Sequence, residues 1–547
     1  MKRFPWLRRG RKSEPEAPIQ APVFLQDRSN GEFFHTQTPR EQAVQRLVAK
    51  AAESYRRRLG VDRRTFLASS MGMATTLAAI NLSCSTAGKA SLDSGPIATD
   101  AVDALLDSGS VDAGGDLNGY DVGGELLDAQ STCTALDTSG FFIFDVQTHH
   151  INPTGPWRQT NPIYQTFFSF LPQAACGLGA LECFSVEQYI EQIFINSDTA
   201  VAVLSSVPAE LCSDTKKFSC DSPLRNDEIM ASQELINALA QSQRVVNHCM
   251  ITPNTDLDGQ LAIMELMAGD HAVSAWKCYT PWGPNGSGWR LDDPAVGIPF
   301  IEKGLELGVG LFCCHKGLPL PGFDASNGGP EDVAIVAKSY PDAKFLVYHS
   351  AFKHGGQDKE GPYDPDGTWD ADNPNLYPAT KGINSLVHAI ETSGLGKNSN
   401  VYAELGSVWS DVMTDPDQAA HILGKLLKHV GEDNVVWGTD SIWYGSPQPF
   451  IEAFRTFNIS TEFQEKYGYP ELTDAIKAKI LGLNAAAIYG VDPDAMRCVI
   501  DKGDLAQAKR QLDAELGPRR WTASKPAGPR TLGEFWAHAK AAGNRPT

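Results

Sequence analysis

The chain has 547 residues, of which 42% are hydrophobic and 21% are charged, a composition ordinary for globular proteins. That length exceeds one small domain and suits a large barrel with appended segments. The net charge of −19 argues against a nucleic-acid partner, because binding a polyanion requires a basic surface.

The N-terminal region, residues 1–84, is rich in Lys and Arg over residues 1–64 and contains the run Asp62-Arg63-Arg64-Thr65-Phe66-Leu67. Two arginines followed by Phe-Leu and by the weakly hydrophobic stretch 66–82 resemble a twin-arginine export signal. We therefore expect the twin-arginine export machinery as a partner, and the periplasm or cell envelope as the location. The alternative interpretation is an amphipathic helix flanked by arginines. The residues before Cys84 match a lipid-anchor site poorly.

Residues 85–138 are rich in Gly, Ser, Asp and Ala, with ten acidic residues between Asp93 and Asp137. Such a stretch has too little apolar surface to order itself, which predicts an acidic flexible linker. Its Asp-Gly content does not have the spacing of an EF-hand calcium loop.

From residue 139 to 491, short apolar runs alternate with amphipathic helical stretches, which predicts an α/β fold, a (β/α)₈ TIM barrel. An open doubly wound sheet remains an alternative, although no Gly-rich phosphate loop follows the first strand. The predicted strands are 141–147, 200–206, 245–251, 273–279, 309–315, 344–349, 400–405 and 434–440. The predicted helices include 186–196, 232–243, 332–340, 384–392 and 418–430. Residues 492–547 form a polar, partly helical tail.

The eleven cysteines form no paired CxxC motif, which excludes a zinc finger. Four of them lie in apolar, strand-like runs and are expected to be buried thiols: Cys249, Cys278, Cys313 and Cys314. In an oxidising compartment, Cys176 with Cys183 and Cys212 with Cys220 could form disulfides.

Polar side chains follow the predicted strands at the ends where a barrel enzyme carries its site. Strand one ends with Gln147 and His149, strand five with His315, strand six with His349 and strand eight with Asp440. Alternation along a strand lets Gln147 and His149 both face the barrel mouth. Two imidazoles and a carboxylate would surround a divalent ion and leave a position for water, which the ion would activate.

At these residues, and over about 141–491, the chain resembles the amidohydrolase superfamily, and within it the amidohydrolase-related branch that includes aminocarboxymuconate-semialdehyde decarboxylase. The run Ile480–Gly490 is similar to the closing helix of that branch. The resemblance implies a fold of the metal-dependent hydrolase type, with metal ligands His149, His315 and Asp440. Asp440 would also be the base that accepts a proton from metal-bound water, and His349 would orient substrate or act in acid–base catalysis.

The chain departs from that family at Gln147, where the HxH pattern has its first histidine. A glutamine oxygen is a weaker ligand for Zn²⁺ than imidazole. The ion is therefore expected to be Zn²⁺ bound more weakly, another divalent ion, or no ion at all.

Three further residues are candidates for substrate binding. Lys277 on strand four is expected in a charge-pairing role, either with a substrate carboxylate or with Glu404 on strand seven. A carboxylated lysine that bridges two metals is a less favoured alternative. Trp282, on the loop after strand four, would form a pocket wall or lid. The long loops 151–185 and 351–379 are expected on the same face.

The predicted function is a metal-dependent hydrolase that attacks a C–N or C–O bond of a small organic substrate. A non-oxidative decarboxylase of the same family is an alternative, because both reactions use the same barrel and ligands. A non-catalytic binding protein on a degenerate barrel is another, for which Gln147 is the main argument. The expected partners are a small-molecule substrate and, as an alternative left open by the sequence, a second copy of the chain in a homo-oligomer.

Overall fold

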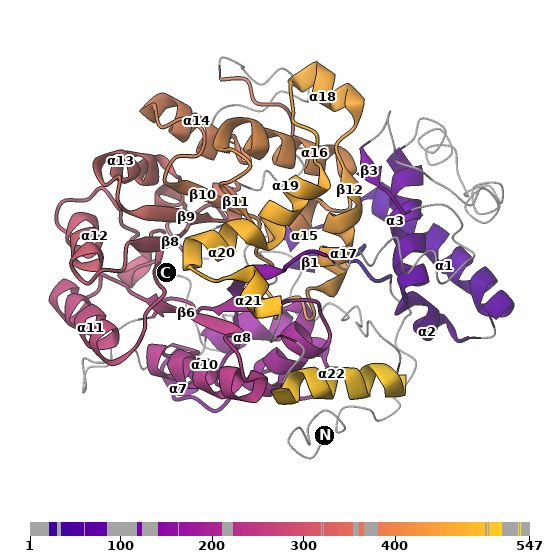
Figure 1. Cartoon of the computed structure of the whole chain (residues 1–547), viewed down its shortest axis with the longest axis horizontal. Helices are drawn as coiled ribbons and strands as arrows, with labels where there is room; N and C mark the ends of the chain where they lie inside the picture. The colour runs from indigo at the N-terminus through magenta and orange to yellow at the C-terminus, as the bar shows by residue number, and fades with distance from the viewer. Residues whose placement is uncertain are drawn as a thin grey trace.

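The fold is that of a computed structural model. It describes residues 21–29, 34–59, 61–84, 118–122, 140–161, 163–209, 222–318, 320, 322–353, 360–365, 381–497, 500, 503–516, 534 and 537. Within these residues, eight strands form one parallel sheet whose order follows the chain, with helices around it (Figure 1). The strands are β4 (Phe144–Thr148), β5 (Val201–Leu204), β6 (Val245–Met250), β7 (Ala275–Tyr279), β8 (Leu311–His315), β9 (Lys344–Tyr348), β10 (Val401–Glu404) and β11 (Val435–Val436). The (β/α)₈ barrel expected from the sequence is confirmed.

The sheet closes through the residues that follow β11. Thr148 bridges Ser441 in parallel, and the backbone N–H of Asp440 donates to the Gln147 carbonyl at 2.9 Å. The N–H of Val146 donates to the Trp437 carbonyl at 3.0 Å. The first and last strands are therefore neighbours, and the two strand ends that carry Gln147 and Asp440 lie side by side.

Alternate residues of the strands pack into two separate apolar clusters, as expected for a barrel whose strands are buried on both faces. On β8, Leu311 and Cys313 belong to the inner cluster, whereas Phe312 and Cys314 belong to the outer cluster beneath the helices. Helix α20 (Asn484–Tyr489) contributes Ala485 and Ala486 to the inner cluster. The four cysteines predicted to be buried thiols are buried and unpaired.

The outer helices follow the strands in turn. Helix α9 (Val186–Tyr189) continues into the π-helical segment η4 (Ile190–Ile195), and α16 (Pro416–Lys425) continues into η8 (Leu426–Val430). The others include α10 (Asn226–Ala240), α11 (Leu257–Asp270), α12 (Gly297–Glu306), α13 (Glu331–Ser339) and α14 (Asn384–Ser393). All five helices predicted from the sequence are found, although two of them end in π-helical turns.

The N-terminal residues fold into three helices, α1 (Pro39–Leu59), α2 (Arg63–Leu67) and α3 (Ser70–Cys84), beside the barrel (Figure 1). Asp62 caps α2 by accepting from the N–H groups of Arg64 and Thr65. The residues Phe66 and Leu67 of the predicted export motif are buried. Most of α3 is buried as well, so this stretch packs as a core helix. No helix among the described residues is long and apolar enough to cross a membrane.

Part of the predicted linker is also built into the fold. Residues 118–122 are described, and β3 (Gly119–Tyr120) pairs antiparallel with β12 (Phe457–Asn458), next to the barrel. Tyr120 is fully buried, and its hydroxyl donates to the Met413 carbonyl. One aromatic residue thus provides the apolar surface that the surrounding acidic stretch lacks. The rest of the linker lies outside the described residues.

At the other end of the chain, α22 (Gly503–Leu516) packs against α10 and η4 (Figure 1). The Lys509 ammonium donates to the Ser197 carbonyl and lies 3.6 Å from the Asp198 carboxylate. The described part of the predicted tail is therefore a helix docked on the barrel.

Candidate active site

The candidate site lies where β4, β8, β9, β10 and β11 end. Three of its non-glycine residues adopt left-handed backbone conformations, with φ of 57° at His349, 57° at Ser407 and 62° at Asp440. Such conformations are costly for residues with a Cβ, and they cluster at functional sites. Their concentration at three strand ends marks this face of the barrel as the site.

Asp440 lies at the centre of the cluster. Its Oδ1 is 3.0 Å from His149 Nε2 and accepts from Gln147 Nε2 at 3.0 Å. Its Oδ2 accepts from the Ser407 hydroxyl at 2.6 Å, and that hydroxyl accepts from the Tyr444 hydroxyl at 3.1 Å. Burial raises the pKa of Asp440, but the contacts with His149 and Ser407 outweigh burial and hold the pKa below its usual value. Asp440 is therefore a carboxylate engaged on both oxygens.

The three histidines are oriented by backbone carbonyls, which can only accept hydrogen bonds. His149 Nδ1 donates to the Ser205 carbonyl at 3.0 Å, His315 Nε2 to that of Leu318 at 2.9 Å, and His349 Nδ1 to that of Gly406 at 2.8 Å. This arrangement fixes each tautomer and turns the other ring nitrogen toward the site. Burial lowers the pKa of His349 to about 4 and that of His315 well below its usual value. Both rings are therefore neutral near pH 7.

The inward nitrogens face other acceptors. His349 Nε2 lies 3.2 Å from His315 Nδ1, and His149 Nε2 faces the Asp440 carboxylate. Two lone pairs face each other stably only with a proton or a cation between them. Gln147 lies between the two pairs, and its Oε1 is buried without a hydrogen-bond partner. The chemistry of this donor set fits a divalent cation.

The residues are not arranged as a closed metal cage. Within the described part of the chain, no three His, Cys, Asp or Glu side chains surround one point as ligands of a single ion. The predicted ligands His149 and Asp440 are in contact, whereas His315 contacts His349. Gln147 presents its amide nitrogen to Asp440, so its oxygen points elsewhere. The predicted residues therefore lie together as two contacting pairs, His149 with Asp440 and His315 with His349, with Gln147 between them.

Glu404 and Lys277 do not form the ion pair that was one of the two sequence-based alternatives. The Glu404 oxygens instead accept from the backbone N–H groups of His349, at 2.8 Å, and Gly406. Burial raises the pKa of Glu404 to about 8, against those hydrogen bonds. Two backbone N–H groups therefore hold the Glu404 carboxyl group, which joins the strand ends that carry His349 and Ser407.

Aromatic rings flank the imidazoles. Trp443 stacks on His149, with ring centroids 4.9 Å apart and planes 2° apart, and Tyr279 stacks on His315 at 4.3 Å. The loop 151–185 supplies Phe168 and Phe184 around Trp443. This loop carries the disulfide Cys176–Cys183, one of the two pairings considered. The other pair, Cys212 and Cys220, lies outside the described residues.

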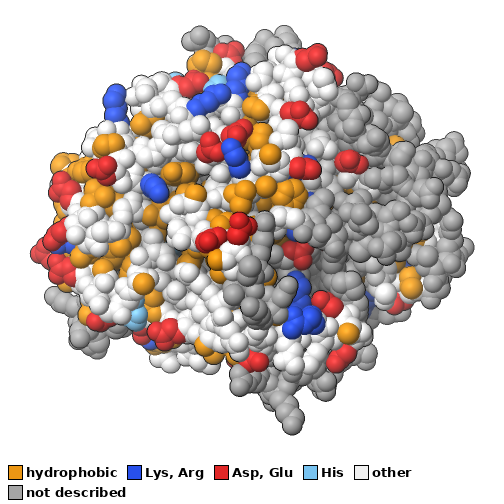
Figure 2. Space-filling model, viewed as in Figure 1, with side chains coloured by type: hydrophobic (Ala, Val, Ile, Leu, Met, Phe, Trp, Pro, Cys, Tyr) orange, Lys and Arg blue, Asp and Glu red, His pale blue; other side chains and the backbone are white. Residues whose placement is uncertain are grey.

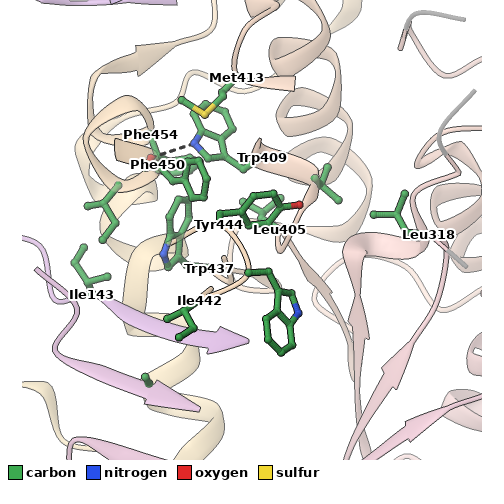
Figure 3. Packing of buried hydrophobic residues seen from close by; sticks show 14 of the residues in the cluster. Ile143, Leu318, Leu405, Trp409, Met413, Trp437, Ile442, Tyr444, Phe450 and Phe454 are labelled. Atoms are coloured by element: carbon green, nitrogen blue, oxygen red, sulfur yellow. Dashed lines mark hydrogen bonds between the residues drawn. The ribbon is translucent and has the colours of Figure 1, made fainter. Parts of the chain in front are cut away.

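Two expectations are not placed at the cluster. Trp282 is only partly buried, and its hydrogen bonds among the described residues are backbone ones, to Asn254 and Tyr279. Most of the loop 351–379 lies outside the described residues. Sequence reasoning missed Ser407 and Tyr444; the only signals were a Gly-Ser pair after β10 and the aromatic run after Asp440. Figure 3 shows Tyr444 among buried apolar side chains that include Leu405 and Trp409.

The fold and site define a (β/α)₈ barrel with a carboxylate–imidazole centre at the carboxyl ends of its strands. Residues 235–491 match the family model described as Amidohydrolase. This match contains His315, His349 and Asp440. It begins after β5 and so leaves out Gln147 and His149. No curated protein matches the chain.

Among solved structures, 5-carboxyvanillate decarboxylase LigW from Sphingomonas paucimobilis is 13% identical, over 64% of this chain and 100% of that one, with a TM-score of 0.37. The 5-carboxyvanillate decarboxylase LigW2 from Novosphingobium aromaticivorans, with bound manganese, is 13% identical over 65% and 99%, with a TM-score of 0.36. The 4-oxalomesaconate hydratase LigJ from Rhodopseudomonas palustris is 14% identical over 69% and 99%, with a TM-score of 0.35.

Proposed function

We propose that the barrel centre catalyses non-oxidative decarboxylation of a small organic acid. The observation that carries the proposal is the state of Asp440, whose two oxygens already contact His149, Gln147 and Ser407 in a site where each of these side chains is at most 2% exposed. A base for hydrolysis must accept a proton from a nucleophilic water, and little of this carboxylate's acceptor capacity remains for one. Decarboxylation needs no water, and a dry site destabilises a substrate carboxylate relative to a transition state with dispersed charge.

In the proposed reaction, the bond between the substrate carbon and its carboxylate breaks, and CO₂ leaves. The electron pair stays on the carbon, which takes a proton that the His149–Asp440 pair relays from bulk solvent, so that one proton is consumed for each CO₂ released. The carbonyl of Ser205 orients His149 for this transfer, and Ser407 holds Asp440. The aromatic faces of Trp443 and Tyr279 exclude water around the two imidazoles.

A divalent cation is part of the proposal, with Zn²⁺ as the first expectation. His149, His315 and Asp440, the ligands expected from the sequence, would have to draw together around it, with Gln147 as a weak additional ligand. When bound, the cation would supply positive charge that polarises a substrate oxygen. Metal analysis of the purified protein tests this part.

Hydrolysis of a C–N or C–O bond is the second candidate, and the match of residues 235–491 to the family model described as Amidohydrolase favours it. Asp440 would then act as the base toward water. One panel of aromatic acids, esters, lactones and amides, assayed for CO₂ release and for hydrolysis, separates the two reactions. If the parent protein shows neither CO₂ release nor hydrolysis, the result favours the alternative of a non-catalytic binding protein.

Asp440→Asn should lower CO₂ release about a hundredfold or more, because the pair loses its carboxylate partner for proton transfer. His149→Ala should have an effect of similar size. The matched control is Asp342→Asn, which removes an exposed carboxylate. Turnover that survives in Asp440→Asn would remove this residue from the chemistry.

We also propose export to the periplasm or cell envelope through the twin-arginine pathway, on the strength of Arg63-Arg64 and the stretch that follows. Because α3 is buried, we expect the exported protein to keep these residues. Cell fractionation with intact-mass measurement tests both points. Self-association remains open and is tested by the mass in solution.

A further inference from the structure

Lys277, at the centre of β7, carries a buried ammonium group without a polar partner. Its side chain is fully buried, and Nζ has no hydrogen-bond acceptor. No carboxylate of the described residues lies within ion-pair distance of it. Burying a charge without a partner is among the most costly arrangements in a protein.

The other buried lysines of the described chain are all satisfied. Lys316 Nζ lies 2.7 Å from the Asp332 carboxylate, and Lys425 donates to Glu360 and to Asn384, the latter at 2.7 Å. Lys477 donates to the Arg455 carbonyl at 2.9 Å and to Asn458 at 3.2 Å. Elsewhere, therefore, this fold provides an acceptor for every ammonium that it buries, and Lys277 is the exception.

Aromatic faces surround the Lys277 ammonium. Nζ lies 3.0 Å from the ring centroid of Tyr348 and 5.0 Å from that of Tyr279. Such faces attract a cation but carry no neutralising charge. Tyr279 also stacks on His315, and Tyr348 directly precedes His349. The unpaired ammonium is therefore separated from the imidazoles of the candidate site by these two rings, and its charge contributes to lowering the pKa of His315 and His349.

We infer that Lys277 is the receptor for a carboxylate of the substrate, an inference that rests on the proposed function and specifies its substrate class. The bound carboxylate would be the hydrogen-bond acceptor and counter-charge that the Lys277 ammonium lacks in the protein itself. Glu404 does not take this role: its oxygens accept from the backbone N–H groups of His349 and Gly406, and Lys277 Nζ has no hydrogen bond to it. Burial lowers the pKa of Lys277 to about 8, so the group is still largely charged near pH 7.

The test compares the wild type with Lys277→Met by thermal unfolding, with and without benzoate, salicylate or phthalate. A lysine kept for stability would lower Tm when replaced. If Lys277 instead serves to bind an anion, the Tm of Lys277→Met without ligand should equal or exceed that of the wild type. The wild type should be stabilised by at least one of the three acids, and the variant should lose that shift, with a Kd about tenfold or more weaker.

Lys338→Met, which removes the charge of an exposed lysine, controls for net charge and should keep the ligand shift. Lys277→Arg should retain part of the binding, because the charge is preserved. A Met variant with a lowered Tm, an equal ligand shift in wild type and Met variant, or no shift in the wild type would overturn the inference. Binding that depends on Lys277 without any CO₂ release would leave it standing while the proposed decarboxylation fails.

Discussion

Ser407 shows how a strained residue can serve a neighbour. It adopts φ of 57°, and in that conformation its hydroxyl reaches Oδ2 of Asp440 while accepting from Tyr444. The residue makes no substrate contact that the structure defines, so we regard it as a positioning residue. Its strain is the cost of orienting the carboxylate.

Ser407→Ala should lower kcat about tenfold and leave KM nearly unchanged, because Asp440 loses the hydrogen bond that orients its Oδ2 rather than a group that binds substrate. Tyr444→Phe, which removes only the donor to Ser407, should act in the same direction and more weakly. Ser339→Ala, an exposed serine on α13, is the control. A change confined to KM would contradict the positioning role.

The pKa of Lys277 also predicts how stability depends on pH. The folded value is about 8 against 10.5 for the free side chain, so between these values the unfolded chain holds a proton that the folded chain lacks. Stability should therefore rise by about 3 kcal/mol from pH 8 to 10.5, and this gain is lost as pH falls through 8. The groups that act electrostatically on or with Lys277 are Cys278, Cys313, Glu404, Asp440, His248, His315 and His349.

Urea unfolding of the wild type and of Lys277→Met across this pH range measures the effect as a difference, so that contributions from other groups cancel. Lys277→Met should lack the rise. Parallel curves for the two proteins would show that Lys277 titrates normally.

At this scale, the strand-end residues could be predicted because alternation on a strand decides which side chains face the mouth. Their tautomers could not be predicted. They depend on the carbonyls of Ser205, Leu318 and Gly406, which belong to other segments of the fold. The expected Lys277–Glu404 ion pair is absent for a similar reason: Glu404 accepts a hydrogen bond from the backbone N–H of His349 instead.

Among the elements, each of the eight predicted apolar runs overlaps a strand of the barrel. The shortest, β11, keeps only Val435 and Val436 of a predicted seven-residue run. Its remaining residues leave the regular ladder, because Asp440 turns into the left-handed region to reach Gln147 and His149. Hydrophobic pattern locates a strand well but does not show where a functional residue ends it.

The stretch 66–82 is apolar and rich in small residues in either interpretation, whether as an export signal or as a helix. The structure makes it the buried helix α3 by pairing Asn81 with the backbone of Tyr120. Asn81 Nδ2 donates to the Tyr120 carbonyl at 2.6 Å, and Asn81 Oδ1 accepts from the Tyr120 N–H at 2.9 Å. These partners are 39 residues apart, across a linker whose composition signals no structure.

Asn81→Ala should lower the free energy of unfolding by about 2–3 kcal/mol, because it removes two buried hydrogen bonds and leaves backbone groups unpaired. Urea unfolding measures the change. Gln243→Ala, an exposed amide outside these contacts, should be neutral. No loss in Asn81→Ala would show that α3 and β3 are not joined in solution.

Over the whole molecule, one barrel carries two attachments from opposite ends of the chain. Helices α1 to α3 lie on one side, and α22 lies against α10 (Figure 1). On the face shown in Figure 2, acidic and basic side chains are interspersed among apolar ones. Composition and pattern predicted the barrel, but the attachments depend on a few specific contacts, such as Lys509 with Asp198, that have no sequence signature.

The pairing of β3 with β12 can form only late in translation, after residues 457–458 have been made. The Asn118 side chain accepts from the N–H of Ser460, 342 residues later in the chain. Contacts so distant in sequence form slowly. During translation, the N-terminal helices could pack against the barrel only after its last part, which carries β12, has been made. Their apolar faces would be uncovered until then. The packing of the N-terminal helices against the barrel would therefore be completed only after residues 457–460 have been made.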